Sequence, residues 1–237
     1  MMRFHLNIPI EQLLLAACVC FGLALLGCNT QVFEPESFPV MIAQLPAAEG
    51  DTILISVRAL VTRVVDPDSY LNGAVEIGDE VNGYYLYDES AEDSHKKPDI
   101  GQYDFNLPPF GMEMLVNDLA FRSDTNSVAM SIRLRNNAAS GKRDTYRVTS
   151  SSNLDVLPGV GVFDILIVLE DNTATALTND ALSGIVVDLD DWRSKHTLTI
   201  TGNDGWRIEA DLASSSVGDP EAEEEDAGGS KRKFRLQ

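Results

Sequence analysis

The segment His196–Leu212, HTLTITGNDGWRIEADL, alternates apolar and polar side chains on both sides of a glycine-containing turn. Leu198 and Ile200 alternate with threonines, and Trp206 begins a second run in which every other residue is apolar. A period of two is typical of strands with one buried face, because successive side chains point to opposite faces. The turn at 202–205 is short enough to join two antiparallel strands. The segment therefore predicts a β-hairpin that places Trp206 in the core.

The same alternation recurs through residues 50–213, with no sustained helical pattern. Comparable segments are Thr52–Val65, Val81–Tyr87, Met112–Phe121, Ser127–Leu134, Thr145–Thr149 and Val162–Leu169. Short strands separated by turn residues indicate an all-β fold with antiparallel pairing. We predict a single antiparallel β-sandwich over residues 50–213, with a β-barrel as the alternative. At Asn179–Ser194 the alternation lapses, and we expect a loop with a short helix or 3₁₀ turn.

Segments of different composition flank this domain. Residues 28–49 contain three prolines and no clear period, which is typical of a tether. Residues 214–237 contain few apolar side chains, and their acidic block at 219–226 precedes a basic block at 231–235. Because so little apolar surface is present to offset the entropy of ordering, we predict that this charged tail is disordered.

Residues 1–27 have the pattern of an export signal. The apolar run Leu13–Leu26 is shorter than the about 20 residues that a membrane-spanning helix needs, but it fits the apolar core of a signal peptide. It ends in Leu25-Leu26-Gly27-Cys28, which resembles the lipobox of bacterial lipoproteins. The resemblance implies cleavage after Gly27 and attachment of lipid to Cys28, which would anchor the protein to a membrane. An ordinary cleaved signal peptide and an uncleaved short anchor are the alternatives.

The residues around this cysteine also bear on localisation. Asn29 stands where an inner-membrane retention signal of bacterial lipoproteins usually has Asp. The resemblance therefore implies a lipid-anchored protein of the bacterial cell envelope, at the outer membrane rather than the inner one where both exist.

All three cysteines, Cys18, Cys20 and Cys28, lie in the leader or at its edge. The mature domain thus has no thiol for disulfides, cysteine-based zinc sites or thiol catalysis.

An ordered series of short motifs runs through the β-rich region. They are Gly78-Asp79, Gly83-Tyr84, Tyr87-Asp88, Pro98 to Tyr103, Pro109 to Met112, Asp144 to Tyr146, Leu169 to Asp171, Thr175 to Leu182 and Asp188 to Trp192. Through their order the chain resembles, over Val57–Leu212, a group of exported bacterial β-domains of unknown function, often found in proteins with a C-terminal PEP-CTERM sorting segment. The resemblance implies export and no particular activity. This chain instead ends in SKRKFRLQ, which is consistent with anchoring through Cys28.

The excess of acidic over basic residues limits the kinds of partner that the protein can bind. The chain has a formal net charge of −19, and residues 50–212 contain 13 Lys and Arg against 27 Asp and Glu. Such a field repels nucleic acid, so we expect no nucleic-acid partner. It favours cations and basic partners, and it also keeps a domain soluble.

Divalent-cation binding is the sharpest hypothesis that the acidic loops allow. Calcium takes six to eight oxygen ligands, and acid-rich loops occur at 66–73, 88–99 and 187–192. The densest loop supplies the predicted metal ligands Asp88, Glu89, Glu92, Asp93 and Asp99, with calcium as the candidate cofactor. The alternative is turn chemistry, in which these side chains accept hydrogen bonds from nearby backbone N–H groups.

Catalysis has no sequence motif to support it. The chain lacks a G-x-S-x-G elbow, an H-E-x-x-H pair and a P-loop, so we predict no catalytic residue. Exposed aromatic side chains among Trp192, Trp206 and the tyrosines at 84–87 would favour sugar stacking. The sequence therefore favours a non-catalytic binding or envelope-organising domain, stabilised by calcium, with an envelope protein or glycan as its partner. The alternative is an exported hydrolase whose acidic active site is assembled in space.

Overall fold

The computed structural model describes residues 52–137, 143–182, 187–218, 224–225 and 231–232. The chain divides into Met1–Ala43 and Gln44–Gln237, and all the described strands belong to the second unit. The predicted signal peptide, Cys28 and the tether lie outside the described residues. Within the part of the chain that is described, no helix is long and apolar enough to cross a membrane.

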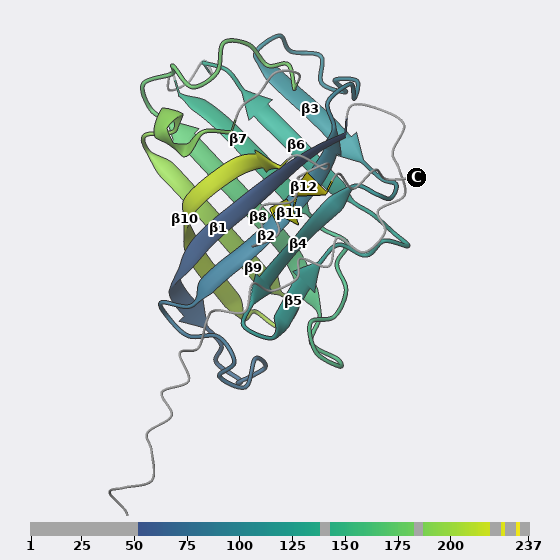
Figure 1. Cartoon of the computed structure of the whole chain (residues 1–237), viewed down its shortest axis with the longest axis vertical. Helices are drawn as coiled ribbons and strands as arrows, with labels where there is room; N and C mark the ends of the chain where they lie inside the picture. The colour runs from purple at the N-terminus through teal and green to yellow at the C-terminus, as the bar shows by residue number, and fades with distance from the viewer. Residues whose placement is uncertain (1–51, 138–142, 183–186, 219–223, 226–230, 233–237) are drawn as a thin grey trace, which may run out of the picture. The chain divides into compact units, whose positions relative to one another are not determined.

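Ten antiparallel strands form one continuous sheet in the order β3-β6-β7-β8-β9-β10-β1-β2-β4-β5 (Figure 1). A 3₁₀ turn, η1 (Leu189–Asp191), lies in the β8–β9 connection, within the segment predicted to hold one. A separate pair joins β11 (Glu224–Glu225) to β12 (Lys231–Arg232). The ten strands of the sheet are β1 (Thr52–Val65), β2 (Glu80–Asp88), β3 (Ile100–Phe105), β4 (Gly111–Val116), β5 (Leu119–Arg122), β6 (Met130–Arg135), β7 (Asp144–Ser150), β8 (Val162–Asp171), β9 (Lys195–Gly202) and β10 (Arg207–Gly218).

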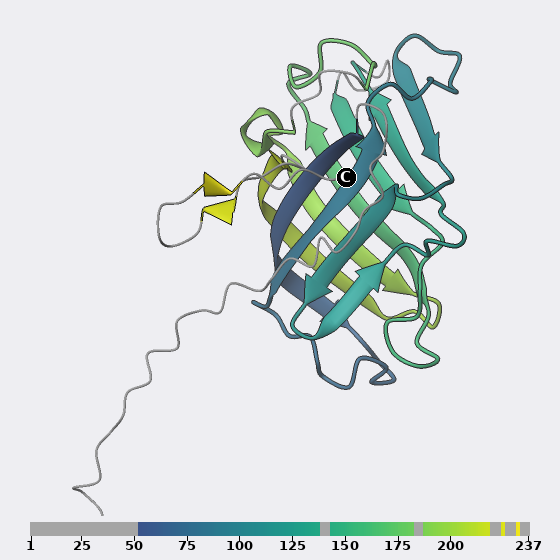
Figure 2. The ribbon, with the colours of Figure 1, turned by 45° about the vertical axis from the view of Figure 1, so that its right-hand side comes forward.

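The all-β, antiparallel prediction is confirmed, but the predicted two-sheet sandwich is not. The single sheet curls into a half-barrel, and Figures 1 and 2 show β1, β2, β4 and β5 crossing in front of β7, β8 and β9. Strand β1 pairs with β10 on one side and with β2 on the other, which keeps both halves in one hydrogen-bonded sheet. Register shifts between Arg58 and Ala59 and between Val61 and Arg63 mark bulges, which bend a strand and increase its twist.

Apolar side chains fill the inner face of the curled sheet. Alternate side chains of each strand point into the core, and in β6 these are Met130, Ile132 and Leu134. Trp206 is fully buried and contacts the ring of Phe121, so its predicted place in the core is confirmed. The interior is therefore occupied by the protein's own side chains.

Two buried tyrosines form a polar contact within this core. The hydroxyls of Tyr85 and Tyr146 lie 3.0 Å apart, so each satisfies the other. Burial raises the pKa of both phenols, which keeps them neutral hydrogen-bonding groups.

Local contacts cover both edges of the sheet. Beside β3, the Gln102 N–H donates to the Asp93 carboxylate and the Gln102 carbonyl accepts from the Ser94 N–H, both at 2.8 Å. Beyond β5, Ser123 forms a bridge with Asn153, and the Ser123 and Ser150 hydroxyls lie 2.8 Å apart. These contacts shield edge strands that would otherwise offer their backbone groups to other chains.

One strand end and one whole strand differ from the prediction. Strand β10 continues to Gly218, and residues 214–218, which we assigned to the tail, pair with residues 54–58 of β1. Backbone pairing needs no apolar side chain, so composition did not reveal this extension. Strand β3 was also not predicted, because its sequence IGQYDF follows an acidic loop directly. The rest of the tail, apart from β11 and β12, lies outside the described residues.

The β9–β10 turn provides a test of this packing. A Cβ at Gly202 would overlap the buried Trp206 indole, whereas Gly205, at φ +84°, has open space around it. We expect Gly202→Ala to lower the free energy of unfolding by about 3 kcal/mol through overpacking. Gly205→Ala should cost only about 1 kcal/mol, through left-handed backbone strain. Urea unfolding of both variants measures the difference, and an equal or smaller loss for Gly202→Ala would contradict the packing described.

Candidate functional site

An arginine-lined depression of about 640 Å³ lies on the outer face of β3, β6, β7 and β8. Four of its lining residues are arginines, and we call it the arginine depression. The lining residues are Gln102, Ser131, Arg133, Arg135, Arg143, Thr145, Arg147, Thr149, Val168, Glu170 and Asn172.

Strand alternation builds this surface. In β6, Ile132 and Leu134 point into the core, so the intervening Arg133 points outward. In β7, Tyr146 and Val148 are buried in the same way, and the intervening Arg147 is exposed. The residues that complete the core thus force the arginines onto one outer surface.

Strand register then brings two arginines face to face. Arg133 and Arg147 are direct partners across the β6–β7 pair, and Gln102 of β3 is the partner of Arg133 on its other side. Side chains directly opposite on antiparallel strands have Cβ atoms about 5 Å apart, and like charges there are destabilising. The arrangement therefore needs compensation by negative charge.

The protein supplies little of that compensation. Arg143 Nη1 lies 3.2 Å from Glu170 Oε2, and Glu170 is the one carboxylate that lines the depression among the described residues. For Arg133, Arg135 and Arg147, no ion pair occurs within the described part of the chain. This is notable in a domain where acidic residues outnumber basic ones about two to one.

Hydrogen bonding leaves one arginine group unsatisfied. Arg147 Nε donates to Thr149 Oγ1 at 3.3 Å, but Arg133 Nε is buried and has no hydrogen-bond partner among the described residues. A buried donor without a partner is costly, and its cost is larger when the group is charged. The depression therefore presents an unused donor together with uncompensated positive charge, which is what an anion-binding site requires.

Sequence reasoning did not single out these arginines. They come from two strands and their connection, so no contiguous motif contains them. The available signal was the alternation of Ser131, Arg133 and Arg135 with apolar residues, followed by Arg143, Thr145 and Arg147 in the same phase. In an acidic chain, two successive strands with arginine on one face predict a local basic surface.

Two of the predicted metal ligands, Asp88 and Asp93, accept hydrogen bonds within or beside their own loop. The Asp88 carboxylate accepts hydrogen bonds from the N–H and the hydroxyl of Ser90, at 2.8 and 2.6 Å. The Asp93 carboxylate accepts from the N–H groups of His95 and Gln102. These bonds are the turn chemistry that was the alternative to calcium.

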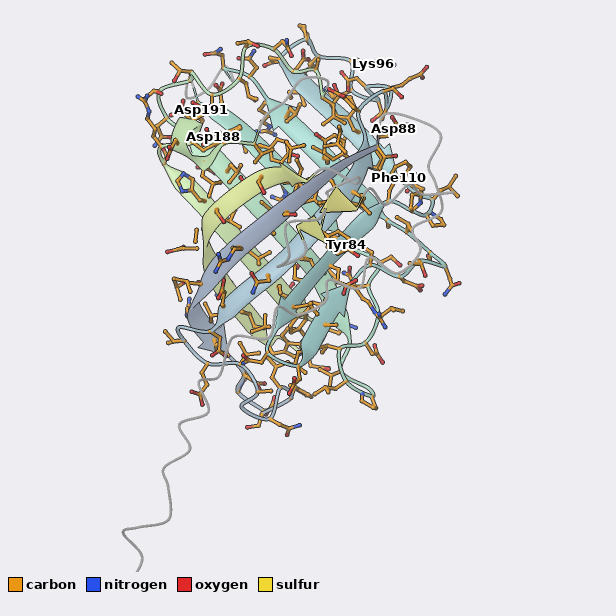
Figure 3. The ribbon with its side chains drawn as sticks, in the orientation of Figure 1. Tyr84, Asp88, Lys96, Phe110, Asp188 and Asp191 are labelled. Atoms are coloured by element: carbon orange, nitrogen blue, oxygen red, sulfur yellow. The ribbon has the colours of Figure 1, made fainter. Side chains whose placement is uncertain are left out.

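The remaining predicted ligands do not complete a cluster. Glu89 is half-buried, Glu92 is exposed, and Asp99 uses its backbone carbonyl to accept from the Asn136 N–H. Across the described residues, no three Asp, Glu, His or Cys side chains are arranged to hold a metal ion. Figure 3 also places Asp88 on the opposite side of the upper end from Asp188 and Asp191, so the acidic loops there are separate. Calcium binding stays a prediction.

Two buried carboxylates lie side by side at the ends of β7 and β8. Asp144 and Asp171 are strand partners, and both are fully buried. Asp144 accepts from the N–H groups of Asn137 and Leu177, each at 2.8 Å, and Asp171 accepts from the N–H and hydroxyl groups of Thr173 and Thr175. These bonds anchor the adjoining loops, which accounts for the burial of both carboxylates.

The aromatic side chains that suggested sugar stacking are largely in the core. Trp192, Trp206, Tyr85 and Tyr87 are all buried. Tyr84 lies on the other face of β2, and its hydroxyl donates to Glu113 Oε2 at 3.2 Å. Burial and the neighbouring Glu113 raise the pKa of Tyr84 to about 12. Among the described residues, none that lines the arginine depression is aromatic.

No family model, curated protein or solved structure matches this chain. The resemblances to bacterial lipoproteins and to exported β-domains therefore stay predictions. The site must be interpreted from its own chemistry.

The Asp171 anchor predicts a pH-dependent stability. Burial raises the pKa of its carboxyl group, but the hydrogen bonds from Thr173 and Thr175 outweigh burial and lower the pKa from 3.8 to about 2. A lowered pKa stabilises the folded state above pH 4, and this contribution disappears as the pH falls from about 4 to about 2. At pH 7 we expect Asp171→Asn to cost about 2 kcal/mol.

Urea unfolding at pH 7, 4 and 2.5 tests this expectation. The difference between wild type and Asp171→Asn should shrink toward the lowest pH. The matched control is Asp124→Asn, because Asp124 accepts the Asn126 N–H in an exposed turn. The proposed anchoring role would be wrong if the two substitutions cost the same at pH 7.

Proposed function

We propose that this protein is a non-catalytic binding domain of the bacterial cell envelope, held at a membrane by lipid on Cys28, and that its arginine depression binds an anionic envelope polymer. One observation carries the binding proposal. Three arginines, Arg133, Arg135 and Arg147, share an open outer surface without a carboxylate partner within the described residues. Guanidinium groups bind anionic oxygen atoms through paired, charge-assisted hydrogen bonds.

The shape and lining of the depression favour a polar ligand. Its volume lies within the range of small-ligand sites, but only Val168 among its lining residues is aliphatic. Ser131, Thr145 and Thr149 add hydroxyl groups beside the arginines. Guanidinium and hydroxyl groups together suit a chain that carries both anionic groups and hydroxyls, as acidic glycans do.

The acidic remainder of the domain supports selectivity for this surface. With a net charge of −19, most of the molecule repels anionic polymers. A polyanion can approach favourably only where basic side chains gather. Among residues 52–218, binding should therefore concentrate at the arginine depression and should weaken as salt screens the attraction, and the basic block at 231–235 is the other cluster of positive charge in the chain.

Titration with polyanions tests the binding proposal. We expect the folded protein to bind polyphosphate or polyglutamate, but not neutral dextran, with affinity that falls as salt rises. Arg133→Ala with Arg147→Ala should weaken binding by at least 10-fold, because the two facing charges are removed together. Isothermal titration calorimetry measures the affinities, and thermal unfolding checks that the variant remains folded.

The matched control removes two arginines outside the depression, Arg63 and Arg193. Arg63 lies 3.6 Å from Glu209 on the outer face, and Arg193 is exposed after η1. The double variant Arg63→Ala with Arg193→Ala has the same net charge as the test variant. Equal weakening by both variants, or no binding of any polyanion by wild type, would refute the binding proposal.

Lipid attachment is tested separately in bacterial cells. Labelling with radioactive palmitate should mark the full-length protein, and Cys28→Ser should abolish the label, because thioether attachment needs the cysteine sulfur. The control variant, Cys18→Ser with Cys20→Ser, should keep the label, since those cysteines lie within the leader. An unlabelled wild-type protein, or a labelled Cys28→Ser variant, would contradict lipid anchoring at Cys28.

A further inference from the structure

We propose that Arg133 and Arg147 form a clamp for a tetrahedral phosphate dianion, carried as a phosphate monoester on the polymer that the domain binds. This inference rests on the proposed function and specifies the anion that the arginine depression recognises. The two arginines are direct partners on β6 and β7, in the middle of the surface that lines the depression.

The Nε–H group of Arg133 is a buried hydrogen-bond donor that an anion would satisfy. Its Nε lacks a hydrogen-bond partner among the described residues, although the outer surface beside it is lined with polar groups. A guanidinium group binds an oxyanion best through two parallel N–H donors, and Nε with one terminal nitrogen makes such a fork. Because this Nε is buried, an anion reaches it only when the Arg133 side chain turns toward the depression, and the anion would then satisfy the donor and bind the charge together.

The charge of the two arginines matches that of a phosphate monoester. Two facing guanidinium groups carry two positive charges, which one carboxylate neutralises only in part. A phosphate monoester carries about −1.5 to −2 charges near pH 7 and three terminal oxygens. These oxygens form a pyramid with the phosphorus, so two forks approaching from adjacent strands can each bind a pair of oxygens, with one oxygen shared between the pairs. A carboxylate has two coplanar oxygens and fills a single fork.

The depression itself contains an example of carboxylate pairing. Glu170 bonds one arginine, Arg143, at 3.2 Å and leaves the facing pair unpaired. Glu170 is also the strand partner of Lys195, so positive side chains from β9 and from the β6–β7 connection flank it. The carboxylate that the protein provides is thus already satisfied, and an anion from outside is needed for Arg133 and Arg147.

Neighbouring side chains would engage the rest of a phosphorylated sugar. Ser131 and Thr149 are strand partners one position along the same outer surface, and their hydroxyls lie beside the facing arginines in the lining. On the far side of Arg133, the Gln102 amide donates to Asp104 Oδ1 at 2.8 Å and keeps that carboxylate engaged. Asp104 also accepts from the Ser94 hydroxyl.

Two small ligands that share a pyranose ring and carry different anionic groups at C6 test the clamp. Glucose 6-phosphate and glucuronate both present an anion on a hexose, one as a phosphate monoester and the other as a carboxylate. We expect the full chain to bind glucose 6-phosphate at least 10-fold more tightly, measured by chemical-shift titration at pH 7.5. Inorganic phosphate should compete at the same site but bind more weakly than the sugar phosphate.

The variant Arg133→Lys with Arg147→Lys tests whether the preference for phosphate comes from the paired N–H donors of arginine or from positive charge alone. Lysine keeps both positive charges and loses the paired donors, so the preference for phosphate should fall to about 2-fold or less while polyanion binding persists. Arg63→Lys with Arg193→Lys should leave the preference unchanged.

Each contrary result has a distinct meaning. Equal affinity for the two sugars, or no binding of either, would overturn the phosphate clamp, and the proposed function would survive if polyanions still bound through the arginines. Tighter binding of inorganic phosphate than of glucose 6-phosphate would overturn the monoester on a polymer in favour of the free ion. Failure of every anion, polymeric or small, would refute both proposals.

Discussion

Backbone pairing along β1 holds the two halves of the sheet together, and both the core and the outer surface follow from it. Its 14 residues pair with β10 on one side and with β2 on the other. Bulges on the β10 side let this long strand bend, so that the two halves of the sheet face each other without a break in the ladder. The alternation of Ile55, Val57 and Ala59 with outward polar residues then directs one face of both halves into a shared core.

The filled core determines where binding chemistry can lie. Trp206, Tyr146 and Phe121 are fully buried in the interior, and the β8–β9 connection covers one end through Leu177 and Leu182. The Tyr103 hydroxyl fastens that connection by donating to the Asp180 carbonyl and accepting from the Leu182 N–H, at 2.9 and 3.1 Å. The arginines without ion-pair partners therefore lie on the outer face of the sheet. Strand alternation and register bring them together there in the arginine depression.

Alternation predicted most of the strands because it reports a local property, the burial of one face. It placed β1 at Thr52–Val65, as observed, and predicted the β9–β10 hairpin with Trp206 inside. It did not distinguish a two-sheet sandwich from one curled sheet, since both have the same inward and outward pattern. That difference lies in which strands pair, and pairing depends on contacts distant in sequence.

The same distinction explains what was missed at the site. The acidic loop 88–99 was conspicuous because its charges are contiguous, yet Asp88 and Asp93 accept hydrogen bonds within and beside that loop. Arg133 and Arg147 are 14 positions apart, and only the β6–β7 register makes them neighbours. Calcium binding by that loop stays a prediction, whereas the pairing of Arg133 with Arg147 could be recognised only from the fold. Nitrogen-15 NMR of the arginine Nε–Hε groups during addition of inorganic phosphate shows which arginines bind the anion. If Arg133 and Arg147 form the clamp, their signals shift first and saturate together, whereas uniform small shifts across all arginines, including Arg63 and Arg193, would contradict the clamp.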